Sequence, residues 1–171
     1  LPSFCFDVET SGLDPKNAQL LGLAVSWEKG TGHYVQFPAA QGSAHAMLEE
    51  FRGLFEKSGV EKIGHNLKFD LLVLRWHGIR AEGPFFDTML AHTLVEPEQR
   101  HTMDYVSESL LGYTPVSIKS LIGDRNQPGG QLSMLDIFDQ KADDIAAYAA
   151  EDADVTWQIA ALLRPKLAEK G

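Results

Sequence analysis

Two acidic residues near the start of the chain have the type and spacing of metal ligands. From Phe4 to Glu9, bulky apolar residues alternate with small or acidic ones, a pattern typical of a half-buried β-strand. Side chains two positions apart on a strand share a face, so Asp7 and Glu9 would lie side by side. Burial and mutual repulsion both disfavour two charged carboxylates at this separation. We therefore expect a bound divalent cation to offset their charge.

A third acidic residue interrupts the apolar face of the predicted helix 142–163. One stripe of this helix is apolar or amphipathic except at Asp152, and its other members are Ile145, Tyr148, Ala149, Val155, Thr156, Ile159, Leu162 and Leu163. An unpaired carboxylate in a core-facing stripe is costly, which makes Asp152 a candidate ligand. Tyr148 precedes it by one turn on the same face. Glu151 and Asp154 lie off the stripe, and we expect them to be solvated surface acids.

A fourth candidate, Asp70, shares a helical face with apolar residues in the predicted helix 67–77. For this residue alone, an ion pair with Lys68 or Arg75 is the alternative interpretation. Together the four acids form an oxygen-only set without a Cys or His pattern, which suits Mg²⁺ or Mn²⁺ rather than Zn²⁺. Four carboxylates around two such cations support in-line displacement at phosphorus.

The elements that must position these acids follow from the remaining pattern. Three strands at 3–8, 19–27 and 33–37 predict an antiparallel meander, and shorter strands follow at 62–64 and 85–86. Helices are expected at 43–59 with Ser43 as N-cap, 67–77, 87–95 with Asp87 as N-cap, 103–111, 118–122, 135–138 and 142–163, the last closed by Pro165. The glycine-rich stretch 123–131 is expected to be a mobile surface loop. The pattern predicts one α/β domain over 1–171, with a mixed five-stranded sheet flanked by helices.

Composition limits the classes of protein without selecting one. The 171 residues carry a formal net charge of −9, whereas duplex-binding proteins normally present basic patches. Either the chain is an acidic enzyme with no polyanionic partner, or its acids gather where metal ions reverse the local field. The lone Cys5 allows no internal disulfide, and no signal peptide or long apolar run supports secretion or membrane insertion. Because the chain starts without Met and directly in a strand, we expect a domain of a longer protein.

Three stretches of the chain resemble a known family. The stretches Phe6-Asp-Val-Glu-Thr-Ser-Gly-Leu13, Gly64-His-Asn-Leu-Lys-Phe-Asp70 and Tyr148-Ala-Ala-Glu-Asp-Ala-Asp-Val-Thr156 are similar, in order, to the three exonuclease motifs of the DEDDy 3′–5′ exonucleases. The chain is closely similar to the proofreading domain of bacterial family A DNA polymerases, which residues 86–90 and 100–104 also resemble. The resemblance covers nearly the whole chain and implies an RNase H-like fold.

The resemblance also implies a role for each residue at the site. Asp7 would bridge two divalent cations, Mg²⁺ or Mn²⁺, with Glu9 and Asp152 completing the shell of the first. Asp70 would hold the second cation, partly through water. Tyr148 would orient the attacking water, assisted by Glu9.

Contacts with the substrate are implied on both sides of the acids. Thr10 and Leu13 would touch the terminal nucleotide, with Leu13 as an apolar wedge against a base or, alternatively, an ordinary turn leucine. Asn66 would contact the strand near the scissile phosphate. His65 stands where the family commonly has Gln, and it could still donate to a phosphate or a sugar. Arg100, with its neighbour His101, is a candidate phosphate contact, although a solvated surface arginine is the alternative.

The implied activity is metal-dependent release of nucleoside 5′-monophosphates from the 3′ end of single-stranded DNA. The alternatives are an RNA-trimming exonuclease of the RNase D type, a non-catalytic module that holds single-stranded DNA, and an acidic domain with coincidental spacing. The implied partner is the polymerase domain of the same parent chain. We expect a monomer in the cytoplasm, associated with the nucleoid.

Overall fold

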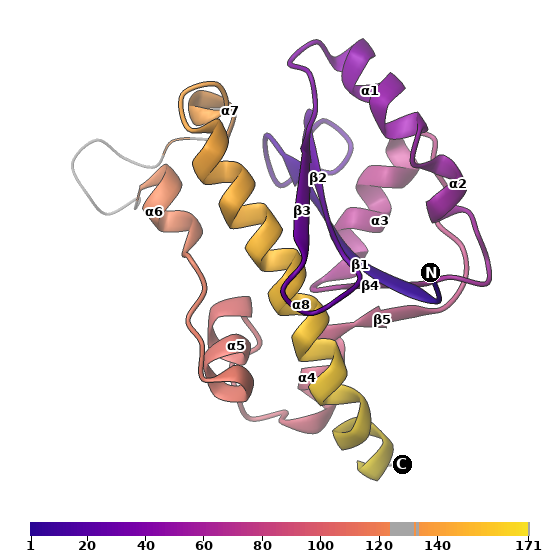
Figure 1. Ribbon diagram of the computed structural model, residues 1–171, viewed down its shortest axis with the longest axis vertical. Coiled ribbons are helices and arrows are strands. Elements are labelled where there is room, and N and C mark those ends of the chain that lie inside the picture. The colour runs from indigo at the N-terminus through magenta and orange to yellow at the C-terminus, as the bar shows by residue number, and fades with distance from the viewer. Residues whose placement is uncertain (124–131, 133, 171) are drawn as a thin grey trace.

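The computed structural model describes residues 1–123, 132 and 134–170, and it contains the predicted mixed sheet (Figure 1). The strands are β1 (Ser3–Thr10), β2 (Leu20–Ser26), β3 (Gly32–Gln36), β4 (Glu61–Gly64) and β5 (Phe85–Asp87). Their order is β3-β2-β1-β4-β5, with β1–β2 and β2–β3 antiparallel and β1–β4 and β4–β5 parallel. The antiparallel meander predicted from the sequence is therefore confirmed, and β1 is the central strand.

Helices cover both faces of this sheet (Figure 1). Their bounds are α1 (Gln41–Glu49), α2 (Arg52–Phe55), α3 (Leu67–Trp76), α4 (Thr88–Val95), α5 (Met103–Leu111), α6 (Ile118–Ile122), α7 (Met134–Ile137) and α8 (Ala142–Lys170). The helices α1, α2 and α3 pack on one face, and α8 contacts β1, β2, β3 and β4 from the other. The predicted loop 123–131 lies, apart from Gly123, outside the described residues.

The alternation of β1 divides its side chains between these two layers. Phe4, Phe6 and Val8 are buried in the core beneath α1, α2 and α3. Cys5 faces α8, where it contacts Ala160. Asp7 and Glu9 follow Cys5 on its face of the strand, so they point toward α8, as the sequence predicts.

The helix expected over 43–59 is instead two helices, α1 and α2, separated near Phe51. Ser43 is not its N-cap, because α1 begins two residues earlier at Gln41. The Gln41 side chain accepts from the backbone N–H of Leu20 at 2.9 Å and donates to its carbonyl oxygen at 3.2 Å. This tertiary contact ties the start of α1 to β2, which no local capping pattern reveals.

Pro165 does not end α8, which continues to Lys170. Leu163 before the proline and Leu167 after it both pack into the core cluster that α8 shares with α4 and α5. Arg164 adds a two-pronged ion pair with Glu61. We infer that these contacts outweigh the roughly 3 kcal/mol that an interior proline costs a helix. Neither α8 nor any other helix in the described part of the chain is long and apolar enough to cross a membrane.

Candidate active site

The structure brings the four predicted acids together at the end of β1. Asp7 and Glu9 come from β1, Asp70 from the first turn of α3, and Asp152 from the middle of α8. Asp70 is only 2% exposed, and its Oδ1 accepts from the backbone N–H of Val8 at 3.0 Å. The described residues contain no ion pair between Asp70 and a lysine or arginine, so that alternative is not supported. Asp70 is instead bonded directly to β1, at Val8, the residue between Asp7 and Glu9.

The carboxyl groups are close enough to share protons. Glu9 and Asp70 both hydrogen-bond to Asp7, which accepts from them when they carry the proton. Burial raises the pKa of Asp7, and it raises those of Glu9 and Asp70 much further, with the charge of Asp7 adding to both shifts. Burial, followed by the charge of Asp7, raises the pKa of Asp152 to about 8. Ionising all four carboxyl groups is therefore unfavourable in the folded chain, and a bound cation would offset their negative charge.

Tyr148 provides a hydroxyl group at the edge of this cluster. It lies one turn before Asp152 on α8, and its hydroxyl donates to the Asp152 carboxylate. Burial, and then the charges of Asp152, Glu9 and Asp7, raise the pKa of Tyr148 far above that of a free tyrosine. Tyr148 is therefore a neutral hydrogen-bond donor at any physiological pH.

A second tyrosine near the acids was not predicted. Tyr34 on β3 is paired with Ala24, which is in turn paired with Asp7, so the three residues form one row across the sheet. Burial and the charges of Glu9 and Asp7 raise the pKa of Tyr34. Its hydroxyl donates to the carbonyl oxygen of Leu21 at 3.3 Å. The hairpin register could have identified this neighbour, since residues in one row share a face.

The donor set fits a hard divalent cation by its chemistry, because it consists of carboxylate oxygens with a tyrosine hydroxyl beside them. In the part of the chain that the structure describes, no lysine, arginine or histidine forms an ion pair with these acids. Equally, no three His, Cys, Asp or Glu side chains within that part are placed to hold a metal ion as they stand. Glu9 and Asp70 are hydrogen-bonded to Asp7, so binding a cation there would require loss of the shared protons.

The residues that follow β1 lead from the acids to the surface. The β1–β2 pairing shifts register between Glu9 and Thr10, and β1 ends at Thr10, which still pairs with Leu20. The Thr10 hydroxyl donates to the carbonyl oxygen of Gly12 at 2.9 Å. Leu13 is 87% exposed, which is compatible both with an apolar wedge and with an ordinary turn leucine. Its exposure is what an apolar wedge requires, and its contact with a base stays a prediction.

Asn66 lies between β4 and α3 in a left-handed conformation, with φ at 63°. Asp87 supports this turn by accepting from the backbone N–H groups of Asn66 at 3.1 Å and Leu67 at 2.9 Å. The same carboxylate accepts from Met89 and Leu90, so the predicted N-cap of α4 is confirmed. Asp87 thus fixes the first turns of two helices at once, and only its local role was visible in the sequence.

Both ring nitrogens of His65 are engaged within the protein. Nδ1 lies 2.9 Å from the Thr88 hydroxyl, and Nε2 lies 2.9 Å from the carbonyl oxygen of His101. Because a carbonyl can only accept, Nε2 carries the proton when His65 is neutral. Burial lowers the pKa of His65 and favours that neutral form. Contact between His65 and a phosphate would require the ring to give up one of these partners.

The two remaining candidates are placed differently from each other. Arg100 is exposed in the segment between α4 and α5. The ring of His101 lies 2.8 Å from that of His92 between their Nδ1 atoms, so this histidine has a partner inside the protein. A phosphate contact by either residue stays a prediction.

Glu151 and Asp154, expected to be solvated surface acids, instead join α8 to neighbouring loops. Glu151 accepts from the Tyr113 hydroxyl and from the backbone N–H of Val116 at 2.6 Å. Asp154 accepts from the backbone N–H of Gly30 at 2.7 Å. Both acids lie off the apolar face of α8, as predicted, but their long-range partners cannot be seen in the local sequence.

Comparison with known proteins assigns this arrangement to a family. The model of a family described as 3′-5′ exonuclease matches residues 1–168. DNA polymerase I of Rhizobium leguminosarum is 32% identical over 190 residues, covering 97% of this chain and 18% of the relative. DNA polymerase I of Borreliella burgdorferi is 29% identical over 167 residues, covering 95% of this chain and 17% of the relative. The chain thus spans about a sixth of the length of these relatives.

Solved structures share the fold at low identity. NrnC of Brucella melitensis with bound Mg²⁺ superposes with a TM-score of 0.75 at 24% identity, covering all of this chain and 76% of the other. RNase D of Escherichia coli superposes with a TM-score of 0.66 at 15% identity, covering 98% of this chain and 40% of the other. These likenesses confirm the RNase H-like fold. With the family model matching nearly the full sequence, this chain belongs to the 3′–5′ exonuclease family found in DNA polymerase I.

Proposed function

We propose that this chain removes nucleotides from the 3′ end of DNA as the proofreading part of a longer polymerase chain. The observation that carries the proposal is the cluster of four carboxyl groups, buried at Glu9 and Asp70 and half-buried at Asp7 and Asp152. All four have raised pKa values, and none has a cationic partner among the described residues. Exonuclease domains of this family generally depend on divalent metal ions. The matched relatives named DNA polymerase I favour DNA as the substrate.

Asp7, Glu9, Asp70 and Asp152 would hold two divalent cations, Mg²⁺ or Mn²⁺. When bound, such ions supply positive charge to the attacking and leaving oxygens of phosphoryl transfer. The donor chemistry supports this assignment, and NrnC, which shares the fold, was solved with Mg²⁺ bound. The acids give up their shared protons as cations bind, so metal uptake should release protons.

The remaining side chains would position the water and the strand. Tyr148, a neutral donor anchored to Asp152, can orient a water molecule toward the terminal phosphate. Leu13 is exposed in the segment after β1 and can pack on the terminal base, with Thr10 at the end of β1 touching the same nucleotide. Asn66, held by Asp87, can donate to the strand near the scissile bond. Displacement at phosphorus then releases a nucleoside 5′-monophosphate and leaves a new 3′ hydroxyl.

The proposal is tested by incubating the chain with single-stranded DNA labelled at the 5′ end or at the 3′ end, with Mg²⁺ or with chelator. We expect a ladder of shortened products from the 5′-labelled strand and immediate release of labelled mononucleotide from the 3′-labelled strand. Chelator should abolish both. No metal-dependent cleavage of either strand would identify a non-catalytic module and contradict the proposal.

RNA is the competing substrate, because RNase D shares the fold. A matched RNA oligonucleotide in the same assay separates the two hypotheses. We expect faster turnover of the DNA strand, and faster turnover of the RNA strand would favour the exoribonuclease instead.

A further inference from the structure

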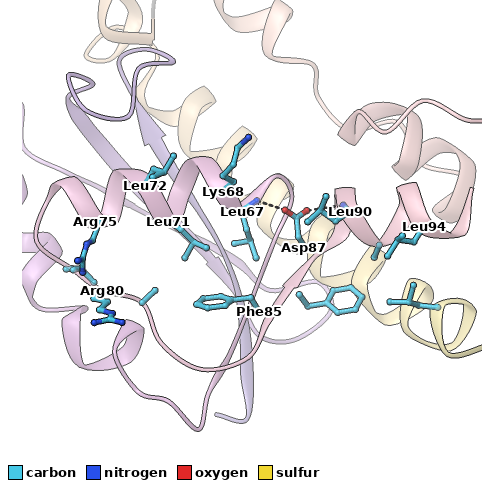
Figure 2. Close-up of a pocket in the computed structure, with 15 residues that line it drawn as sticks. Leu67, Lys68, Leu71, Leu72, Arg75, Arg80, Phe85, Asp87, Leu90 and Leu94 are labelled. Atoms are coloured by element: carbon cyan, nitrogen blue, oxygen red, sulfur yellow. Dashed lines mark hydrogen bonds between the residues drawn. The ribbon is translucent and has the colours of Figure 1, made fainter. Parts of the chain in front are cut away.

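A broad apolar groove lies between α3, β5, α4 and the end of α8, and none of the four active-site acids lines it in the described residues (Figure 2). Its volume is about 850 Å³. Aliphatic side chains dominate its walls, among them Leu67, Leu71, Leu72, Leu90, Leu94 and Leu167. Leu90 and Leu94 are 59% and 65% exposed. Apolar patches of this kind commonly mark an interaction site.

The groove is positively charged on a molecule with a formal net charge of −9. Lys68, Arg75 and Arg80 line it, and Arg75 and Arg80 lie together at the end opposite Leu94 (Figure 2). Within the described residues, none of these three side chains forms an ion pair or a hydrogen bond. The one acid in the lining, Asp87, is already occupied by four backbone N–H groups. The free charge of the groove is therefore complementary to an acidic partner.

The shape and lining favour a helix over a nucleic acid strand. Single-stranded nucleic acids are bound by several aromatic platforms, but Phe85 is the only exposed aromatic side chain among the described lining residues. Rows of leucines on α3 and α4 form the kind of hydrophobic groove that accepts an amphipathic helix. Acidic residues flanking the apolar face of such a helix would pair with Arg75 and Arg80.

The relatives offer a source for this helix. This chain corresponds to only 17% to 18% of their length, so most of each relative lies outside the matched domain. Leu167, near the end of α8, forms part of the groove wall. We propose that the groove binds an amphipathic, acidic-flanked helix from the polymerase region of the same parent chain. This inference rests on the proposed function, in which the chain is one part of a polymerase.

Backbone amide hydrogen exchange tests the proposal by comparing the 171-residue chain with the full-length polymerase that contains it. We expect amides in α4 and in the outer turns of α3 to exchange at least about tenfold more slowly in the full-length protein, since a docked helix must leave before they open. Equal exchange of these helices in both proteins would overturn the proposal.

The apolar contact is tested in the full-length polymerase by the double variant Leu90→Gln/Leu94→Gln. Both side chains are exposed in the isolated chain, so the fold should survive. We expect exchange in α4 to return to the rate of the isolated chain. Leu162→Gln, at a 39% exposed position outside the groove, is the control and should keep the protection.

The charged contact is tested by Arg75→Glu/Arg80→Glu, with Lys29→Glu/Lys57→Glu as a control of equal charge change outside the groove. We expect the groove variant alone to lose protection of α4. No effect of the groove variant, or an equal effect of the control, would contradict the assigned acidic partner.

Two measurements on the same charge variants exclude other occupants. Weaker binding of a labelled oligothymidylate by Arg75→Glu/Arg80→Glu would make the groove a nucleic-acid surface and overturn the proposal. Dimerisation of the isolated chain in sedimentation, lost in Leu90→Gln/Leu94→Gln, would identify a second copy instead and also overturn it. Nuclease activity on single-stranded DNA should be unchanged in both groove variants. If the wild-type chain also lacked nuclease activity, the proposed function would be refuted, and the hydrogen-exchange comparison would still test the groove.

Discussion

Two sites on neighbouring strands bury charge and balance it in opposite ways. On β4, Lys62 is fully buried, and its Nζ donates to the carbonyl oxygens of Lys57 at 2.6 Å, Val60 at 2.7 Å and Glu82. On β1, Asp7 lies among further carboxyl groups and has no cationic partner in the described residues. Both sites result from the same sheet, since Lys62 is paired with Phe4 three positions before Asp7.

Burial acts on both sites, lowering the pKa of Lys62 and raising the pKa of Asp152 to about 8. The difference lies in the neighbours. Three backbone dipoles of the right sign surround the ammonium group, whereas each acid has other acids beside it. Lys62 therefore completes the fold without a ligand, and the acid cluster is a site that an external cation would complete.

The largest expected effect is on catalysis. Asp7→Asn should lower metal-dependent DNA degradation by about 10³-fold or more, because it removes the group shared by the other acids. Without metal, the same variant should be at least as stable as wild type, since one repelling charge is gone. Steady-state nuclease assays and urea unfolding in chelator measure the two quantities. Asp143→Asn, at an exposed acid near the start of α8, is the control. Retained activity in Asp7→Asn would contradict the site.

Whereas Asp7→Asn should lose activity and keep its stability, Lys62→Met should lower the stability of the fold. Removing the ammonium group takes the side-chain donor away from the carbonyl oxygens of Val60 and Glu82, while the Lys57 carbonyl oxygen keeps the backbone N–H of Val60. We expect the loss to cost about 3 kcal/mol of unfolding free energy. Urea unfolding measures the loss, with Lys57→Met at an exposed lysine as the control. If Lys62→Met were as stable as wild type, the two sites would not differ as described.

Tyr148→Phe removes the donor to Asp152 but keeps the ring. The rate of DNA hydrolysis should fall about 10²-fold, the usual contribution of a positioned proton donor or water-orienting group. Because the Tyr148 hydroxyl lowers the pKa of Asp152, its loss should also shift the acidic limb of the pH–rate profile to higher pH. Tyr105→Phe, whose hydroxyl bonds Gln99 away from the acids, should change neither quantity. An unshifted profile in Tyr148→Phe would argue against its contact with Asp152.

A further prediction concerns stability against pH in the absence of metal. A carboxyl group with a higher pKa in the folded chain takes up a proton on folding, so stability should fall as pH rises from about 4 toward 8, the range set by Asp152. Each unit of pKa shift contributes about 1.4 kcal/mol. Urea unfolding in chelator at intervals across this range shows the slope, and saturating Mg²⁺ should flatten it. Stability that rises toward pH 8 in chelator would contradict the raised pKa values.

Local sequence pattern is sufficient to predict which residues share a face of β1 and of α8, because strand alternation and helical spacing depend only on positions within the same element. It correctly placed Asp7, Glu9 and Asp152 toward one another. It could not show that Asp70 bonds to Val8, since that contact joins residues 62 positions apart.

The remaining errors also come from long-range contacts. Pro165 carries a strong local signal to end a helix, yet packing of Leu163 and Leu167 continues α8 through it. Glu151 looked solvated because its partners belong to a loop about 35 residues earlier. The engagement of both ring nitrogens of His65 depends on how α4 and the following loop fold back on β4. Periodicity carries no information about such partners.

The central claim is that the acids at the end of β1 need a cation that the fold does not supply. Calorimetric titration of the chain with Mn²⁺ at pH 7, repeated in buffers of different ionisation enthalpy, tests it directly. We predict saturable uptake at millimolar or lower concentration with release of protons, and loss of that uptake in Asp7→Asn. Absence of Mn²⁺ uptake by the wild-type chain, or equal uptake by Asp7→Asn, would contradict the account.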